Sequence, residues 1–200
     1  MAVFIAERQQ ERLFYMKRFM HRILMAIRLD GAVYKEIAQD KKALPQAMAV
    51  ILFTTLINIA VGSGLKINIA EIFGTLIIAF LGWYIWTFII YLTGTKLFPG
   101  HETRVEFSGL LPVIGFSHAA GIFILIGLSP ALKDAALFIS AAWIFAAMVV
   151  AVKNVFGYKG ILPALGICLI GVLIQAVALK FMLSLKGYKM EDLIKLNNQL

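Results

Sequence analysis

The sequence predicts an all-α, polytopic membrane protein: five transmembrane helices preceded by an amphipathic interfacial helix and a short charged helix. Composition gives the first indication, because 61% of the 200 residues are hydrophobic, 15% are charged and the mean hydropathy is +0.87. A soluble domain is roughly half apolar and about a quarter charged. The second indication is five apolar stretches, each close to the roughly 20 residues that a helix needs to cross a hydrocarbon core. The excess apolar surface therefore predicts a lipid environment.

The five predicted spans share one property, which is that none contains Asp, Glu, Lys or Arg. They cover residues 45–65, 72–95, 107–132, 135–152 and 160–179. So regular an absence of charge favours membrane-crossing helices over the core helices of a soluble protein. The chain thus divides into a cytoplasmic amphipathic and charged segment at 1–44, a transmembrane domain at 45–185 and a polar C-terminal tail at 186–200.

Residues 3–28 are expected to form a helix that cannot span a membrane, because bases recur along its length. At 100° per residue, its apolar and basic side chains separate onto two faces. Such a helix either lies in the headgroup plane or docks on the transmembrane bundle, and both placements bury the same apolar stripe. The stripe consists of Leu13, Met16, Met20, Ile23, Leu24 and Ile27, and the basic face consists mostly of Lys17, Arg18, His21, Arg22 and Arg28.

The next segment, LDGAVYKEIAQDKKALPQAM at 29–48, carries both signs of charge and turns directly into the first span. Asp30 is predicted to cap a short helix over residues 32–39, and Pro45 suits the first turn of the span. The polar side chains form a candidate cytoplasmic docking edge for a partner. The alternative is a self-contained turn that only positions the first span. The candidate edge consists of Asp30, Tyr34, Lys35, Glu36 and Asp40.

The distribution of Lys and Arg predicts the orientation of the spans. With five spans, thirteen of the 19 bases fall on the side of the N-terminus and six on the other side. We therefore expect a cytoplasmic N-terminus and an external C-terminus. The net charge of +8 suits contact with anionic lipid headgroups. Nucleic acid is not an expected partner, because the bases are dispersed and form no platform with aromatic residues.

The sequence offers no constellation for catalysis. No HExxH, GxSxG, CxxC or Walker motif is present, and every Asp and Glu lies outside the predicted spans. The one cysteine, Cys168, excludes a disulfide framework and a cysteine-based metal site. Haem would need a second axial ligand at the depth of His118, and the other histidines lie outside the spans. We therefore expect no enzyme, no metal and no cofactor.

Six polar or aromatic side chains fall near the middle of the predicted spans, although tryptophan usually prefers the two membrane interfaces. One interpretation is a central cavity in which His118 serves as a ligand or proton site. The other is gap-filling by large side chains, with the amides and the imidazole hydrogen-bonded to neighbouring helices, and this is the favoured interpretation. The six residues are Asn58, Trp83, Trp86, His118, Trp143 and Gln175.

Four segments in order carry a family resemblance: RLDGAVYKEIAQDKKALPQAMAVI, LGWYIWTFIIYLTGTKLFPG, LLPVIGFSHAAGIFILIGLSP and WIFAAMVVAVKNVFGYKGILPALGICLIGVLIQ. Over roughly residues 28–178 the chain resembles bacterial Yip1-domain membrane proteins. The resemblance implies five transmembrane helices, a cytoplasmic N-terminus and no catalysis. Eukaryotic members act in membrane trafficking and engage small GTPases. This chain lacks their Asp-Leu-Tyr-Gly-Pro stretch, which favours the plasma (inner) membrane of a prokaryote over a GTPase-binding role.

Two functions remain open on the sequence. The first is a non-enzymatic integral membrane protein that organises membrane partners or lipid, for example as an accessory subunit of a larger membrane complex. It rests on the basic N-terminal helix and on the absence of a carboxylate within the spans. The alternative is a carrier or channel that moves a small solute through a mid-membrane cavity.

Overall fold

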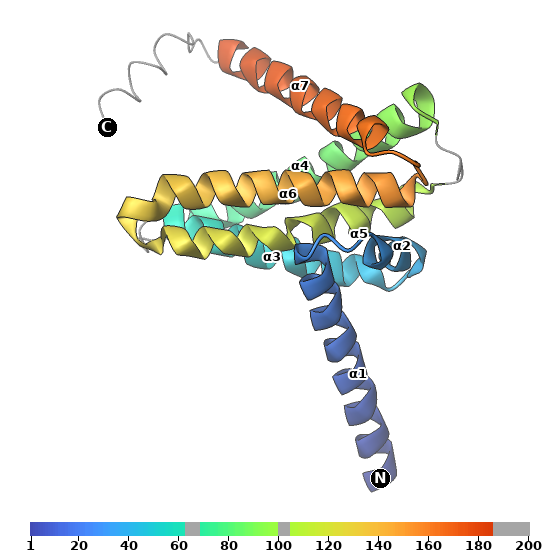
Figure 1. Ribbon diagram of the computed structural model, residues 1–200. Coiled ribbons are helices and arrows are strands. Elements are labelled where there is room, and N and C mark those ends of the chain that lie inside the picture. Colours follow the sequence, from blue (N-terminus) through green and yellow to red (C-terminus); the bar gives the residue numbers. More distant parts are fainter. Residues whose placement is uncertain (63–68, 100–104, 186–200) are drawn as a thin grey trace.

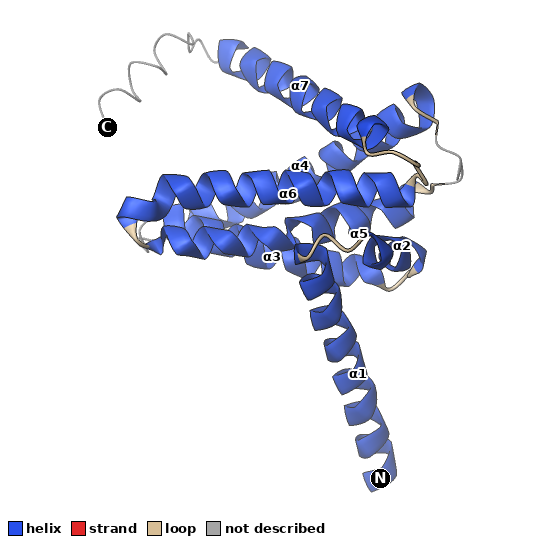
Figure 2. Cartoon of the chain, in the orientation of Figure 1, coloured by secondary structure: helices blue, strands red, loops and turns tan. Residues whose placement is uncertain are grey.

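The computed structural model describes residues 1–62, 69–99 and 105–185, and these residues contain helices and short connections but no strand (Figure 2). The all-α prediction is therefore confirmed for them, whereas the predicted polar tail at 186–200 lies outside them. In chain order the elements are α1 (Ala2–Ile27), α2 (Gly31–Gln39), α3 (Ala43–Gly62), α4 (Ile69–Leu92), the π-helical turn η1 (Thr93–Leu97), α5 (Phe107–Ser117), the 3₁₀ helices η2 (His118–Leu128) and η3 (Pro130–Leu132), α6 (Lys133–Val155) and α7 (Leu162–Leu185).

Four helical segments of the described chain are long and apolar enough to cross a membrane. They are Ala43–Gly62, Ile72–Leu97, Phe107–Leu128 and Lys133–Val155, and they correspond to the first four predicted spans. The described apolar part of α7, Leu162–Val177, is shorter than these. The described residues thus show a membrane protein with four helices of spanning length.

The spanning helices form one bundle from which two helices depart. Helix α3, the α5–η2 segment and α6 lie side by side, and α4 packs against α3 and α5 (Figure 1). Helix α7 contacts α4 and α6 but diverges from α6 toward its C-terminal end (Figure 1). Helix α1 leaves the bundle at a steep angle to α3 and α6 (Figure 1). The short helix α2 packs across α5 and α6 at one end of the bundle.

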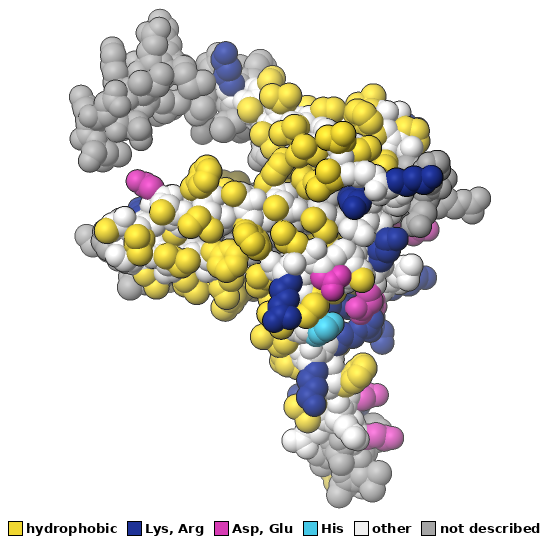
Figure 3. Space-filling model, viewed as in Figure 1, with side chains coloured by type: hydrophobic (Ala, Val, Ile, Leu, Met, Phe, Trp, Pro, Cys, Tyr) yellow, Lys and Arg dark blue, Asp and Glu magenta, His cyan; other side chains and the backbone are white. Residues whose placement is uncertain are grey.

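Large apolar side chains cover the outside of the bundle. Phe53 of α3, Ile78 of α4, Phe138 of α6 and Leu173 of α7 are all exposed. The space-filling view shows apolar side chains over the bundle and α7, with most of the charged ones gathered around α1 and α2 (Figure 3). An apolar surface of this extent is typical of protein that faces hydrocarbon.

Close contacts hold the segments at the α2 end of the bundle together. Gly109 lies so near α2 that a Cβ atom there would come within 2.6 Å of the carbonyl oxygen of Ala38. After α6, the Tyr158 ring stacks on Phe156 with 5.7 Å between ring centroids, and its hydroxyl donates to the carbonyl of Phe98. The N-terminal segment and the chain that follows η1 and α6 therefore share one end of the bundle.

The third span changes helix type in its middle. It is α-helical up to Ser117 and continues as a 3₁₀ helix of 11 residues from His118 to Leu128. Runs of 3₁₀ helix longer than about four residues are uncommon, and they rise about 2.0 Å per residue. Helix η2 packs against α3 and α6. The change of helix type begins at His118, one of the residues predicted near the middle of the spans.

Candidate functional site

A cavity of about 400 Å³ lies between five helical segments, and it opens to the outside of the bundle, where Asn58, Ile78 and Gln175 are exposed. Most of the lining residues belong to α3 and α4, and the others come from η2, α6 and α7. The volume falls within the range of about 300–1,000 Å³ that is typical of small-molecule pockets. Among the residues that the structure describes, no Lys, Arg, Asp or Glu side chain lines this cavity.

The structure brings five of the six predicted mid-membrane residues together around this cavity. They come from α3, α4, η2 and α7, which are separated by up to 117 positions in sequence. The five are Asn58, Trp83, Trp86, His118 and Gln175.

Trp143 does not belong to the cavity, so its assignment to the central cluster is wrong. Its indole Nε1 donates to the carbonyl oxygen of Ile27 at 2.8 Å, at the end of α1. Its ring packs edge-on against Phe123, and 39% of the residue is exposed. The next residue, Ile144, lines the cavity instead. One residue turns a helix by about 100°, so Trp143 has the predicted depth but faces another direction.

Several polar groups at the cavity retain hydrogen-bonding capacity. The Asn58 Nδ2 atom donates to the carbonyl oxygen of Thr54 at 2.8 Å, which leaves Oδ1 free to accept. His118 Nδ1 lies 2.9 Å from the carbonyl oxygen of Ile114. Because a carbonyl oxygen only accepts, Nδ1 donates there, and in the neutral ring Nε2 is then an acceptor. The imidazole therefore bonds to its own helix, as the gap-filling interpretation allows, and also offers its second nitrogen.

Two indole rings join α4 to its neighbours at the cavity. Trp83 Nε1 donates to the carbonyl oxygen of Leu111 at 3.1 Å. Trp86 packs against α7 so closely that a Cβ atom at Gly171 would lie 3.1 Å from the ring. The buried Nε1 of Trp86 has no hydrogen-bond partner in the described part of the chain. The two tryptophans thus position α4 against α5 and α7 and supply aromatic faces at the cavity.

The candidate docking edge on α2 is only partly a free surface: Asp30 and Lys35 are exposed, whereas the inclusion of Tyr34 is wrong. Tyr34 is completely buried, and its hydroxyl donates to the carbonyl oxygen of Ala26 at 3.3 Å. Asp30 caps α2 as predicted, because its Oδ1 atom accepts from the backbone N–H of Ala32 at 2.8 Å. Glu36 and Asp40 turn toward α1, and Lys35 remains exposed. These contacts agree with the alternative, a turn that positions the first span, and docking of a partner at the exposed residues stays a prediction.

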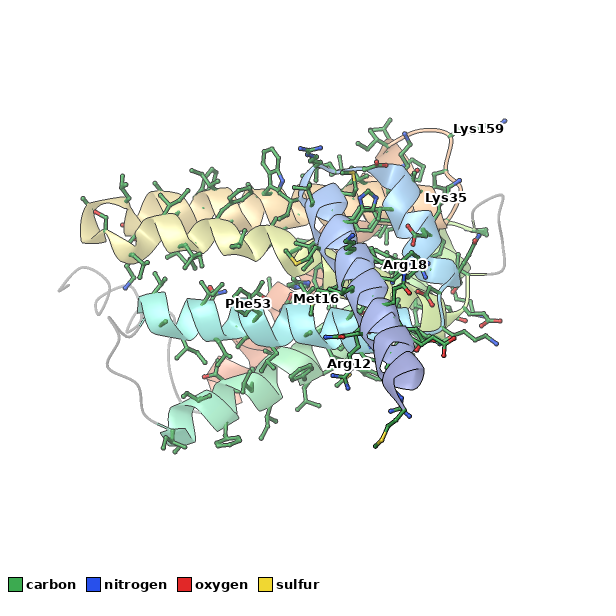
Figure 4. The ribbon with its side chains drawn as sticks, turned by 90° about the horizontal axis from the view of Figure 1, so that it is seen from below. Arg12, Met16, Arg18, Lys35, Phe53 and Lys159 are labelled. Carbon is green, nitrogen blue, oxygen red and sulfur yellow. The ribbon has the colours of Figure 1, made fainter. Side chains whose placement is uncertain are left out.

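A charged cluster that was not predicted from the sequence joins α1, the end of α2 and α3. Arg22 has no exposed surface, and its Nη1 donates to Gln46 Oε1 at 2.6 Å. Its Nη2 donates to Asp40 Oδ2 at 2.6 Å and to Glu36 Oε1 at 3.0 Å. Arg18 points from α1 toward α2 and donates to Glu36 at 2.9 Å (Figure 4). The two arginines and two carboxylates form a neutral set that fixes the base of α1.

Hydrogen bonds and charge attraction from the two arginines determine the ionisation of this cluster. Burial alone would raise the pKa of Glu36 and of Asp40, but hydrogen bonds and charge attraction from Arg22 and Arg18 outweigh it and lower both pKa values. The backbone N–H of Lys42 donates to Asp40 and has the same effect. Burial raises the pKa of the Tyr34 hydroxyl above its ordinary value. The carboxylates are therefore ionised and Tyr34 is neutral at neutral pH.

A pattern in the sequence could have revealed this cluster. Arg18 and Arg22 are four residues apart, and so are Glu36 and Asp40. That spacing places the two arginines on one face of α1, and Asp40 directly follows the last residue of α2. Two bases and two acids at matching intervals in neighbouring segments are able to pair with each other.

The apolar stripe of α1 lies only partly uncovered, because Ile23 and Ile27 pack against the core of the bundle. Four of its residues are exposed, namely Leu13, Met16, Met20 and Leu24. The opposite part of the helix faces the bundle, where Arg22 and Ala26 are buried and the Phe19 ring packs edge-on against Phe116. The stripe therefore docks on the protein's own bundle only at Ile23 and Ile27, and the other four residues do not dock. The buried position of Arg22 corrects its placement on the exposed basic face.

In the described ranges, no three His, Cys, Asp or Glu side chains are grouped so that they could hold a metal ion. Comparison with known proteins adds no relative, because no family model, no curated protein and no solved structure matches this chain.

Proposed function

We propose that this chain is a non-enzymatic integral membrane protein that organises anionic lipid, and membrane partners with it, around helix α1. The proposal places it in the plasma (inner) membrane of a prokaryote as an accessory subunit of a larger membrane complex. The N-terminus is cytoplasmic, α7 forms a fifth span and the C-terminus is outside. The observation that carries the proposal is the exposure of four apolar residues on α1, namely Leu13, Met16, Met20 and Leu24.

The exposure and direction of α1 support a position at the membrane surface. Leu13, Met16 and Met20 are 60%, 57% and 56% exposed, although each belongs to an amphipathic helix that could have buried it. The helix runs at a steep angle to the bundle axis (Figure 1). When the bundle crosses the bilayer, α1 therefore lies close to the membrane plane. Apolar side chains on such a helix enter the boundary between headgroups and acyl chains.

The charges of α1 favour anionic headgroups. Arg12 and Lys17 are exposed on the same helix. Each base near a membrane surface contributes about 1 kcal/mol of attraction to an anionic leaflet. Because the Arg22 cluster fixes the base of α1, these bases are held at one place on the perimeter of the bundle. Anionic lipid would therefore accumulate there.

Two features support five spans with the N-terminus inside. Helix α7 has 24 residues, more than the roughly 20 that a span requires, and Leu173 and Val177 are exposed on it. Lys35, Lys153 and Lys159 lie in segments that share one end of the bundle, and such an excess of bases is typical of the cytoplasmic side. The resemblance to bacterial Yip1-domain proteins implies the same topology.

Site-specific fluorescence tests the proposed position of α1. A Cys168→Ala background receives Met20→Cys or, as the control on the opposite face of the same helix, Glu11→Cys, and each is labelled with an environment-sensitive NBD dye. In nanodiscs that contain phosphatidylglycerol, we expect blue-shifted emission and quenching by nitroxide lipids for the label at position 20 only. Emission typical of water at both positions would overturn the proposal.

A second candidate function, a carrier or channel for a small uncharged solute, is favoured by the cavity. The lining of the cavity carries polar groups but no charge among the described residues. Proteoliposomes in which light scattering follows glycerol entry would test this candidate. Faster entry with the wild-type chain than with His118→Phe is expected if the cavity conducts, and equal rates with empty liposomes would exclude it.

A further inference from the structure

The cavity in the bundle combines uncharged donors and acceptors in a way that indicates a class of ligand. His118 Nε2 is an acceptor once Nδ1 donates to Ile114. Asn58 keeps Oδ1 and one amide hydrogen after its bond to Thr54. The described structure gives the side chain of Gln175 no hydrogen-bond partner, although this residue lines the cavity. Three side chains from three helices thus present unused polar atoms to one space.

These unused polar atoms stand in apolar surroundings. Ile51, Ile78, Ile144 and Met148 line the cavity along with the two indole rings. Asn58 and Gln175 are exposed at the open side of the cavity, which faces hydrocarbon when the bundle crosses a bilayer. Water in a bilayer core is scarce, so these groups have no solvent to bond with. A guest molecule that forms hydrogen bonds with them is therefore bound favourably. The aromatic and branched side chains provide contact area for the apolar part of that guest.

The character of the lining excludes ionic guests. Transfer of an unpaired ion from water into an apolar site is very costly. Among described residues the cavity has neither a base to pair with an anion nor a carboxylate to pair with a cation. A neutral guest that both donates and accepts avoids this cost. A hydroxyl group does so with a single atom.

We propose that the cavity binds a neutral, hydroxyl-bearing molecule. The hydroxyl donates to His118 Nε2 and accepts from an amide hydrogen of Asn58 or Gln175. The carbon skeleton lies against Trp83 and Trp86. The molecule enters either from water, as a small polyol, or from the bilayer, as a neutral lipid with a glycerol head.

This site rests on the same cavity as the second candidate function and names its ligand class, and it is independent of the role of α1. Binding and transport are measured separately. Ligand binding without glycerol entry into liposomes would exclude the carrier and leave the site in place. Glycerol entry without ligand binding would overturn the site and leave the carrier.

Photolabelling of the full chain in phosphatidylcholine nanodiscs tests the proposal. The probe is an octanol with a diazirine on its chain, and mass spectrometry locates its adducts. We expect adducts on peptides that line the cavity. Gln175→Leu and His118→Phe each remove one hydrogen-bonding group and should reduce this labelling roughly five- to tenfold. Trp143→Phe, a conservative change outside the cavity, should leave it unchanged.

Competition then identifies the source of the ligand. Suppression of labelling by glycerol indicates a polyol from water, and suppression by dioctanoylglycerol alone indicates a lipid. Gln175 is exposed, so Gln175→Leu keeps the test valid where His118→Phe fails to fold. The proposal is overturned by labelling that neither competitor suppresses, by labelling that is equal in all variants, or by the absence of adducts at the cavity.

Discussion

Arg22 of α1 and Asp40 after α2 form an ion pair in which Nη2 and Oδ2 are 2.6 Å apart and the arginine side chain has no exposed surface. The pair connects a helix that leaves the bundle to the turn that begins the first span. The Oε1 atom of Gln46 in α3 accepts a hydrogen bond from the other terminal nitrogen of the same guanidinium group. The direction of α1 is therefore set by a buried polar contact and only partly by apolar packing.

Replacement of Arg22 should destabilise the chain much more than replacement of Arg18. In Arg22→Ala, Asp40 and Gln46 lose their buried partner, and we expect a loss of about 2–4 kcal/mol in the free energy of unfolding. Arg18 is 40% exposed in its side chain, so Arg18→Ala should cost less than about 1 kcal/mol. Thermal unfolding in mild detergent, followed by near-UV circular dichroism, measures the difference. Equal losses in the two variants would contradict the importance of the buried contact.

Stability should fall in acid because of Glu36 and Asp40. Their pKa values in the folded chain lie below the ordinary values of 4.5 and 3.8. At pH values between the folded and the ordinary pKa, the unfolded chain binds more protons than the folded chain. The stability that the two carboxylates contribute is therefore complete above about pH 5 and is lost as pH falls through the folded pKa values. Unfolding midpoints measured between pH 7 and pH 3 should decrease accordingly.

The double variant Glu36→Gln, Asp40→Asn provides the control for this pH dependence. Neither side chain can then ionise, so the variant should be less stable at pH 7 and its midpoint should change less toward pH 3. An acid-induced decrease as steep as that of the wild-type chain would assign the effect to other groups.

Helix packing at the α2 end depends on a glycine. In Gly109→Ala the new Cβ atom would meet the carbonyl oxygen of Ala38, a backbone atom that cannot move without shifting α2. We expect a loss of about 1–3 kcal/mol from this overpacking. Gly74 on α4 is the matched control, because nothing lies within 4 Å of a Cβ atom there. Gly74→Ala should leave the unfolding midpoint unchanged or raise it slightly, and equal effects at both positions would exclude close packing as the cause.

Composition and spacing predicted those parts of the fold that depend on local physics. Four apolar stretches became helices of spanning length, because charge-free runs of about 20 residues have no other stable form in lipid. The Asp30 cap was also predictable, since an aspartate before a helix accepts from a backbone N–H within the next few residues. Depth within a span follows from residue number in the same way. Depth alone identified five residues that line one cavity.

Direction around a helix and pairing between helices were not predictable. Trp143 and Ile144 have nearly the same depth, but only Ile144 reaches the cavity. Which one does so depends on how α6 is rotated against its neighbours. Tyr34 and Arg22 were placed at the surface by their polarity, whereas burial beside a specific partner satisfies each of them. Such partners are distant in sequence, so only the assembled structure identifies them.

Accessibility on α2 should alternate between neighbouring positions. Tyr34 is completely buried and Lys35 is exposed. In a Cys168→Ala background, a water-soluble maleimide should modify Lys35→Cys rapidly and Tyr34→Cys only slowly. Labelling in detergent with the rates compared by mass shift measures this. Comparable rates would show that α2 separates from α5 and α6 in solution.

The number of spans determines where the two ends of the sequence lie. With α7 as a fifth span, reporters on the two ends should lie on opposite sides of the membrane, and with four spans on the same side. We expect opposite sides, because the 24 residues of α7 exceed the length of a span and its apolar side chains are uncovered. Green fluorescent protein and alkaline phosphatase fusions at each end report this directly in bacteria. Phosphatase activity at the C-terminal end alone supports the proposed topology, and its absence at both ends would leave α7 on the cytoplasmic side.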